Sequence, residues 1–224
     1  MRALRNIHHL RGGFISPERT GVTSSFVPKL VCKPSHGFDT FKIGIFAGLH
    51  GDEEAGVEAA YKLVHWAWND PAELQDYELH IFPSCNPSER RLASRHSVSG
   101  VDLDRQFWNG SEEPEVRYLE TELRRERYDA LVALHSDSDS GCIYGYVSGA
   151  VLSENVLAPA LQAASAVLPV DNNAVIDGFS AKNGIIRDGY DGVLSAPPEQ
   201  QPRPLEIVLE TPSKLLSHCR WRQL

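Results

Sequence analysis

Two residue types suited to metal binding or proton transfer stand together in the stretch GLHGDEEAG, residues 48–56. His50 and Glu53 lie three positions apart, directly after the apolar run KIGIFA. Imidazole and carboxylate groups at such a place could hold a metal ion, transfer protons or favour a helix N-terminus. The stretch alone does not choose among these three roles.

Three more polar residues follow other apolar runs. Asn86 comes after YELHIFPSC, His135 ends ALVALH, and Glu210 ends LEIVLE. In open α/β sheets, ligands bind beyond the carboxyl ends of the strands, so we expect these side chains to meet at one edge. Two histidines and a carboxylate are a common ligand set for catalytic zinc. We therefore predict His50, Glu53 and His135 as zinc ligands, with Glu210 as the general base.

Each of these residues also has a simpler interpretation. Glu53 or Glu54 could merely favour a helix N-terminus through the macrodipole. A single histidine at a strand end usually makes an ordinary hydrogen bond, and Glu210 could be an ordinary acid at the end of a strand. The joint pattern across four segments favours the metal site.

The elements that must position these residues alternate along the chain. Apolar runs predict strands at 41–48, 77–87, 130–136 and 205–212. Helical periodicity predicts helices at 53–68, 114–129 and 155–169. This order predicts an α/β fold with three α/β/α layers and a mixed, largely parallel central sheet.

Two details of this assignment are specific enough to be checked. The first helix is expected to place Val57, Tyr61, Leu63, Val64 and Trp68 on one face. The segment 177–204 is rich in glycine and proline and is interpreted as one long functional loop. No linker interrupts the chain, so residues 1–224 are expected to form a single domain.

Composition narrows the classes of partner and the compartment. The 224 residues carry a formal net charge of −8, which argues against nucleic acid or an anionic membrane as the main partner. The N-terminal stretch MRALRNIHHLRGGF has no continuous apolar core, so a secretory signal is not expected. The four cysteines are scattered, as in a cytoplasmic protein with reduced thiols; they are Cys32, Cys85, Cys142 and Cys219.

A second cluster of chemically useful residues lies in NPSERRLASRHSVSGVDLDRQF, residues 86–107. Its arginines are suited to binding carboxylates in a bidentate manner or to polarising a carbonyl group. Arg90 and Arg91 are more typical of surface ion pairs, whereas Arg95 and Arg105 are candidates for the site.

These motifs resemble those of the zinc carboxypeptidases, especially the compact bacterial murein-peptide amidases. The matching segments occur in the family's order within residues 41–213 and include HGDE at 50–53, NP at 86–87, GVDLDR at 100–105, LHS at 134–136 and LETP at 209–212. The related succinylglutamate desuccinylases and aspartoacylases share the first motif. The resemblance implies a zinc hydrolase with a three-layer α/β/α fold.

The resemblance also implies roles for single residues. Arg95 would polarise the scissile carbonyl, and Arg105 would receive a terminal carboxylate of the substrate. Asp102 would orient His50, as metal-bound imidazoles require. Asn86 and Tyr190 are further candidates for substrate binding, with Tyr190 at about the place of a mobile tyrosine of the family.

One position departs from the family pattern. Asp104 stands where the family usually has asparagine before the arginine, and an ionised carboxylate would repel a substrate carboxylate. The substitution could favour a substrate with a nearby amine, or Arg105 could neutralise it. Asp104 therefore remains a candidate substrate-binding residue of altered specificity.

The leading hypothesis is a zinc-dependent, carboxypeptidase-like metallopeptidase that hydrolyses an amide bond of a small peptide. An alternative is an N-acyl amino acid deacylase that uses the same chemistry, and a second is a catalytically silent metal- or peptide-binding domain. One zinc ion is expected. A second cation at Asp137 and Asp139 is a further alternative, although the run DSDS is more typical of a turn. The oligomeric state is left open.

Overall fold

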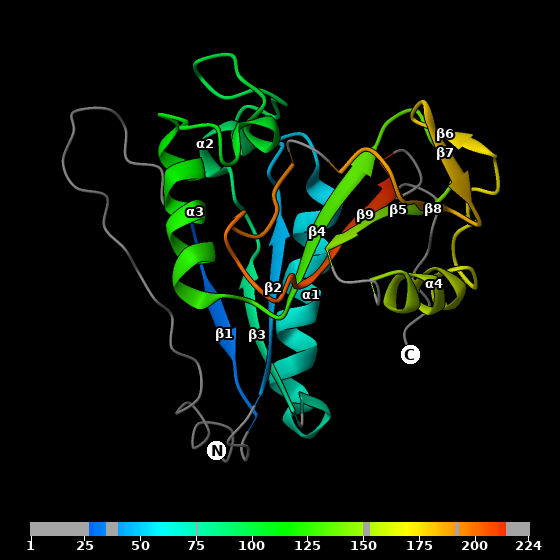
Figure 1. Cartoon of the computed structure of the whole chain (residues 1–224), viewed down its shortest axis with the longest axis horizontal. Coiled ribbons are helices and arrows are strands. Elements are labelled where there is room, and N and C mark those ends of the chain that lie inside the picture. The colour runs from blue at the N-terminus through cyan, green and yellow to red at the C-terminus, as the bar shows by residue number, and fades with distance from the viewer. Residues whose placement is uncertain (1–26, 35–39, 75, 150–152, 191–192, 214–224) are drawn as a thin grey trace.

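The computed structural model describes residues 27–34, 40–74, 76–149, 153–190 and 193–213. These residues form a nine-stranded sheet with the strand order β1-β3-β2-β4-β9-β5-β8-β7-β6 (Figure 1). The strands are β1 Leu30–Cys32, β2 Phe41–Ala47, β3 Tyr77–Phe82, β4 Ala130–Asp137, β5 Tyr144–Gly149, β6 Val175–Ile176, β7 Phe179–Lys182, β8 Ile185–Ile186 and β9 Leu205–Pro212. The helices are α1 Glu54–Asn69, η2 Pro71–Leu74, α2 Pro87–Arg90, η3 Leu103–Gln106, α3 Pro114–Glu126 and α4 Ser153–Ala164.

The sheet is mixed, with a parallel centre. Strands β3, β2, β4 and β9 run parallel to one another, whereas β1 pairs antiparallel with β3 and β5 pairs antiparallel with β9. Parallel strands end at a common edge, so the residues that follow β2, β4 and β9 lie near one another. The predicted strand at 205–212 has the observed bounds of β9.

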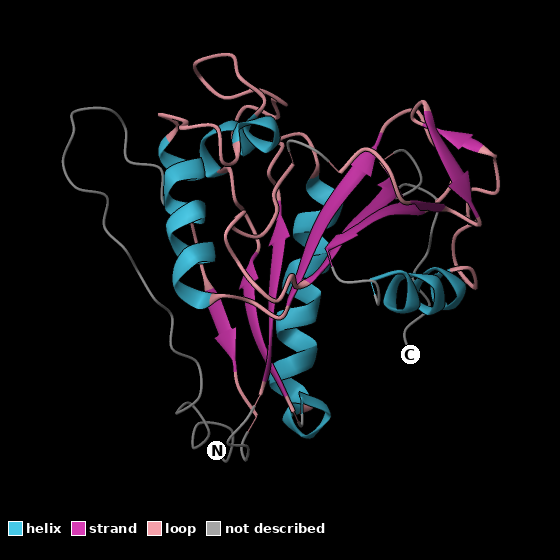
Figure 2. Ribbon diagram, viewed as in Figure 1, coloured by secondary structure: helices cyan, strands magenta, loops and turns pink. Residues whose placement is uncertain are grey.

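Helices cover both faces of this centre (Figure 2). Successive side chains of a strand point to opposite faces, and in β2 Ile45 packs in the cluster that includes Ala60 of α1, whereas Phe46 packs with Leu119 of α3. Leu157 of α4 packs with residues of β5, β8 and β9 in a third cluster. The predicted three-layer α/β/α fold is confirmed.

The buried face of α1 agrees only in part with the predicted one: Val57 is buried as expected, and Leu63 and Val64 are partly buried. Tyr61 and Trp68 are 46% and 48% exposed, and α1 instead buries small residues such as Ala60 and Ala67 against the sheet. A Cβ atom at Gly56 would lie 2.7 Å from the carbonyl oxygen of Leu134 in β4. The helix therefore lies too close to the sheet for large side chains on the contacting face.

The prediction of one long loop at 177–204 is wrong in its first part. Strands β6, β7 and β8 form two consecutive hairpins, with Ile176 paired to Phe179 and Lys182 paired to Ile185. Both turns have two residues, Asp177-Gly178 and Asn183-Gly184, and all four have positive φ. Asp-Gly and Asn-Gly favour this left-handed geometry, which the type I′ hairpin turn requires.

Within the described ranges, no helix combines the length and the apolar character that crossing a bilayer would require.

Candidate metal centre and its cavity

The loop after β2 carries His50 and is held in place by the end of β3. The backbone N–H groups of Cys85 and Asn86 donate to the carbonyl oxygens of Ala47 and Gly48, at 2.8 Å each. The fully buried Asn86 side chain donates from Nδ2 to the carbonyl oxygen of Leu49 at 3.2 Å and accepts from the N–H of Glu89 at 3.3 Å. These bonds show that Asn86 supports the loop from behind, and a substrate contact at Asn86 stays a prediction.

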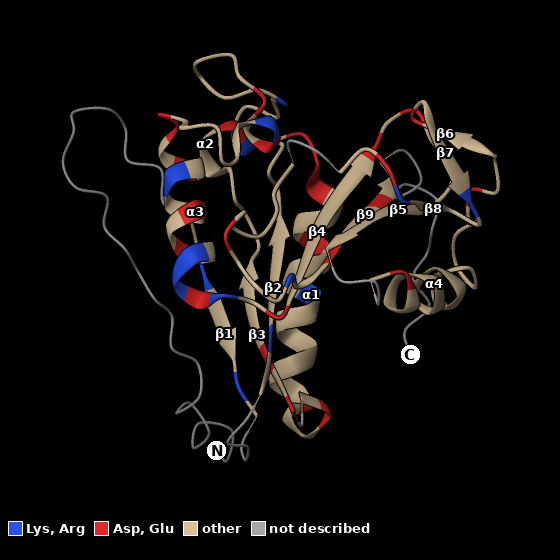
Figure 3. Ribbon diagram, viewed as in Figure 1, with Lys and Arg blue, Asp and Glu red and all other residues tan. Residues whose placement is uncertain are grey.

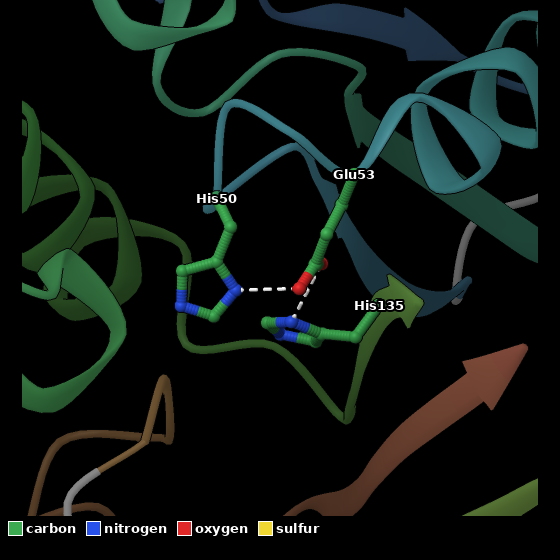
Figure 4. Close-up of side chains that lie close together, drawn as sticks. All are labelled: His50, Glu53 and His135. Carbon is green, nitrogen blue, oxygen red and sulfur yellow. Dashed lines mark hydrogen bonds and ion pairs between the residues drawn. The ribbon is translucent and has the colours of Figure 1, made fainter. Parts of the chain in front are cut away.

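Glu53 occupies the position before the first turn of α1, but its side chain makes no capping hydrogen bond. The carboxylate instead turns toward two histidines (Figure 4). Its Oε1 atom lies 2.7 Å from His50 Nδ1, and its Oε2 atom lies 3.0 Å from His135 Nδ1. Glu53 therefore does not cap the helix with its side chain, and the structure brings together the three predicted metal ligands.

The donor set fits a divalent transition metal. His50, Glu53 and His135 are all buried, and one ligand atom of each lies within 4.8 Å of the others. His135 Nε2 is buried without a hydrogen-bond partner, and Glu53 Oε2 accepts no well-aligned hydrogen bond although His135 Nδ1 is close. Two imidazoles and one carboxylate form a ligand set of catalytic zinc sites. A cation between the three groups would satisfy Glu53 Oε2.

Without a bound metal, protons on His50 and His135 supply the positive charge beside Glu53. Burial alone would lower the pKa of His50, but its hydrogen bonds to Asp102 and Glu53 raise the pKa to about 9. Burial opposes the charged form of His135 as well, but the charge of Glu53 raises its pKa to about 10. Burial would raise the pKa of Glu53, whereas the two histidines lower it to about 2. The centre therefore favours positive charge beside Glu53.

Asp102 lies behind His50. Its Oδ1 atom is 2.9 Å from His50 Nε2 and also accepts a bond from the backbone N–H of Asp104. A histidine that binds a metal through one ring nitrogen usually donates from the other to such a carboxylate, which fixes its tautomer and orientation. The geometry suits the orienting role implied for Asp102.

Glu210 stands beside His135 on the neighbouring strand. The two residues are direct partners in the β4–β9 register, so their side chains share one face of the sheet. Burial raises the pKa of Glu210 to about 7, which His135 opposes and the carboxylates of Glu53, Asp137 and Asp177 reinforce. A carboxylate with a pKa near neutrality is suited to accept a proton from water and to release it again.

A cavity of about 750 Å³ opens over the metal centre, and both predicted arginines line it. The guanidinium of Arg95 lies 3.5 Å from Glu53 Oε1 and 3.4 Å from Asp102 Oδ2. Arg105 is mostly exposed, and its Nε lies 3.7 Å from the same Asp102 oxygen. Both side chains are thus placed to meet a substrate beside the metal centre.

The side chain of Asp104 is directed into the protein. Its Oδ1 atom accepts from the backbone N–H of Leu194 at 2.9 Å, and its Oδ2 atom is 3.9 Å from His135 Nε2. No ion pair joins it to Arg105 among the described residues. Asp104 therefore fixes the segment around Leu194 and adds negative charge near His135.

Tyr190 lines the cavity, but its hydroxyl is buried and has no hydrogen-bond partner. Burial and the charges of Glu206 and Asp104 raise its pKa well above the usual value. The hydroxyl therefore stays protonated and available to donate. A substrate contact at Tyr190 stays a prediction.

The cavity residues that were not predicted from the sequence include Tyr144, Tyr146, Asp177 and Phe179. The Asp-Gly turn was the available signal for the hairpin that carries Asp177. Asp137 was considered for a second cation, but its Oδ1 accepts from the N–H of Asp139 at 2.7 Å, as in a turn. Within the described part of the chain, the group of His50, Glu53 and His135 is the one cluster of three ligating side chains.

Sequence comparison finds a relative over part of the chain. No protein-family model matches the sequence. Carboxypeptidase SOL1 of Arabidopsis thaliana is 32% identical over 103 residues, which cover 39% of this chain and 21% of that protein. The match thus spans about a fifth of the length of this curated relative.

Solved structures match over most of the chain. A proposed metallopeptidase of Shewanella denitrificans OS217 superposes with a TM-score of 0.70 at 20% identity, covering 91% of this chain and 75% of that one. A metallo-carboxypeptidase of Pseudomonas aeruginosa, in complex with (2-guanidinoethylmercapto)succinic acid, has a TM-score of 0.65 at 18% identity, covering 84% and 52%. A succinylglutamate desuccinylase of Silicibacter sp. TM1040 has a TM-score of 0.57 at 21% identity, covering 90% and 59%. The resemblance inferred from the motifs is confirmed at the level of the fold.

Proposed function

We propose that this chain, which has the fold of the zinc carboxypeptidases and of the succinylglutamate desuccinylases, is a zinc-dependent hydrolase that cleaves an amide bond in a small peptide. The observation that carries the proposal is the convergence of His50, Glu53 and His135, with Glu210 on the adjacent strand. Fold alone does not determine activity. A buried set of metal ligands beside a carboxylate of raised pKa, by contrast, is suited to metal-assisted hydrolysis.

The residues divide the chemistry among them. A zinc ion held by the two histidines and Glu53 would supply Lewis-acid polarisation of water and of the scissile carbonyl. Glu210 would take a proton from the attacking water and pass it to the departing amine. Arg95 would stabilise the negative charge that develops on the carbonyl oxygen. Arg105 would hold a substrate carboxylate, and Asp102 would keep His50 in the correct tautomer.

An N-acyl amino acid deacylase is the nearest alternative, because the same centre would hydrolyse either kind of amide. The structural match to a succinylglutamate desuccinylase supports keeping it. The sequence match to a carboxypeptidase favours the peptide substrate. Rates on short peptides and on N-acyl amino acids, measured side by side, separate the two. A catalytically silent binding domain is disfavoured, because such a domain would not need a carboxylate of raised pKa at Glu210, beside the metal ligands.

The proposed setting follows from the same observations. The three described cysteines are free thiols, two of them buried, which supports the proposal of a reducing, cytoplasmic location. The net charge of −8 supports a small substrate rather than nucleic acid as the partner.

Glu210→Gln tests the proposal, because glutamine keeps the size of the side chain and loses the base. We expect zinc content to stay unchanged while kcat falls about 10²–10⁴-fold on the best peptide of the panel. Glu73→Gln, an exposed acid in η2, is the matched control and should leave both quantities unchanged. Wild-type activity in Glu210→Gln would disprove the assigned base.

A further inference from the structure

A second wall of the cavity carries charge that the proposed mechanism does not use. Asp137 ends β4, Tyr144 and Tyr146 lie in β5, and Asp177 occupies the turn between β6 and β7. Tyr144 Oη lies 2.9 Å from Asp137 Oδ2 and 2.7 Å from Asp177 Oδ2. Tyr146 Oη donates to the same Asp177 oxygen at 2.6 Å. We call these four residues the acidic wall.

The two carboxylates of the acidic wall are stabilised by few hydrogen-bond donors. Tyr144 has one phenolic proton, so it donates to one of the two neighbouring carboxylates at a time. No ion pair among the described residues joins Asp137 or Asp177 to a lysine or an arginine. Burial and Asp177 raise the pKa of Tyr144 and of Tyr146 well above the usual value, so both phenols stay neutral. Among the residues that the structure describes, the two carboxylates therefore face the cavity without a cationic partner.

The sheet order places the acidic wall opposite the arginines. Arg95 and Arg105 contact Glu53 and Asp102, on the β2 side of the metal centre. β4 carries His135, and beyond it follow β9, β5 and the hairpin strands. In Figure 3, red segments follow β4 and mark the β6–β7 turn. The metal centre thus lies between an arginine side and an acidic side.

The chemistry of the acidic wall matches a positively charged organic group. Carboxylates make their strongest hydrogen bonds with ammonium and guanidinium donors. The ring of Tyr146 packs edge-on against Phe179, with 6.2 Å between centroids, so aromatic surface borders the two carboxylates, and such surface also attracts cations. The metal centre lines the same cavity, so a substrate held there would extend beside these carboxylates.

We propose that the acidic wall binds an ammonium or guanidinium group on the acyl half of the substrate. This inference rests on the proposed function and specifies its substrate class. With a carboxylate of the leaving half at Arg105 and the scissile amide at the metal centre, the acyl half extends toward Asp137 and Asp177. The substrate is then a short peptide with a positive charge on the N-terminal side of the cleaved bond.

Asp177→Asn is the informative variant. Asparagine tolerates the left-handed conformation of residue 177 and can still accept hydrogen bonds from the tyrosines, so the charge changes and the turn is kept. Asp137→Asn makes the same change on β4. It serves as the test variant if Asp177→Asn fails to fold. Asp70→Asn, at the far end of α1 from Glu53, is the matched control.

Three probes isolate the positive charge: N-acetyl-norleucyl-alanine is neutral on its acyl half, N-acetyl-lysyl-alanine carries a side-chain ammonium, and norleucyl-alanine carries an α-ammonium. We expect kcat/KM of the better cationic probe to exceed that of the neutral probe by about tenfold or more. In Asp177→Asn this ratio should fall toward one, and comparing the two probes within the same variant cancels any effect of the lost charge on Glu210. Asp70→Asn should keep the wild-type ratio.

Calorimetric binding to the Glu210→Gln protein separates this inference from the proposed function. A preference for the cationic probe that disappears in Glu210→Gln/Asp177→Asn supports the acidic wall, even if the wild type cleaves none of the probes and the proposed function fails. Equal binding of the cationic and neutral probes, or a preference that survives the Asp177 substitution, overturns the inference.

Discussion

The parallel centre of the sheet and its mixed flank serve the cavity in different ways. The centre, formed by β3, β2, β4 and β9, is covered on both faces and carries the predicted metal ligands and Glu210 at its carboxyl edge. The flank, formed by β5, β8, β7 and β6, carries three of the four residues of the acidic wall, namely Tyr144, Tyr146 and Asp177, and three of the four residues of β7 are exposed. The comparison suggests that the chemistry depends on the buried strands, whereas selectivity depends on the hairpins.

Removal of a ligand from the centre should therefore have the largest effect. We expect His135→Ala to lose bound zinc, from about one ion per chain to near zero, because two ligands remain. Activity should be lost with the metal. Asp177→Asn, on the flank, should keep the full zinc content, and elemental analysis of both purified variants compares the two regions directly. Unchanged zinc in His135→Ala, or lost zinc in Asp177→Asn, would contradict the division.

Zinc binding should also release protons from the centre. The pKa values of His50 and His135 are raised to about 9 and about 10, so both rings are protonated at pH 7 without metal. A ligating imidazole must be neutral. We therefore expect the release of about two protons per zinc at pH 7, and a zinc affinity that rises with pH until the rings are neutral. Calorimetry in buffers of different ionisation enthalpy measures this number. Binding without proton release at pH 7 would show that the rings are not charged in the metal-free protein.

The smallest effect is expected for the ion pairs of Glu126, which stabilise the protein away from the cavity. Glu126 of α3 accepts from Lys29 and Lys42, at 2.9 Å and 3.0 Å. Burial would raise the pKa of Glu126, but these lysines and Arg125 hold it well below the usual 4.5. Glu126→Gln should lower the free energy of unfolding by about 1–2 kcal/mol at pH 7.

The loss of stability caused by Glu126→Gln should be larger at pH 7 than at acidic pH. The folded-state pKa of Glu126 is depressed, so its contribution is complete above the unfolded-state value of about 4.5 and declines as the pH falls below it. Urea unfolding at pH 7 and at pH 3.5 measures both differences, with Glu112→Gln as the exposed control. Zinc content should not change. An equal loss of stability at both pH values would contradict the ion-pair explanation.

The sequence predicted the centre better than the flank for a physical reason. Buried parallel strands are continuous apolar runs, and the runs around Ile45, Val132 and Val208 predicted β2, β4 and β9 nearly to the residue. Polar residues that follow such runs stand out, and this predicted the convergence of His50 with His135. The flank strands are short and partly exposed, so their residues carry little apolar signal, and only the Asp-Gly and Asn-Gly pairs mark them.

The acidic wall also depends on tertiary pairing that no local pattern contains. β5 returns antiparallel beside β9, which makes Tyr144 the partner of Glu210 in the register. The hairpin turn then brings Asp177 to Tyr144 across 33 positions of sequence. Likewise, the inward direction of Asp104 depends on the backbone N–H of Leu194, 90 positions away. A prediction from spacing along the chain misses contacts of this kind.

The central claim is that one divalent ion joins groups from the ends of β2 and β4. Diffraction from crystals grown with zinc, recorded on both sides of the zinc absorption edge, tests it most directly. We expect one anomalous peak at about 2.0–2.2 Å from His50 Nδ1, His135 Nδ1 and a carboxylate oxygen of Glu53. A map with no peak between these groups, or with the two rings turned away from each other, would contradict the account.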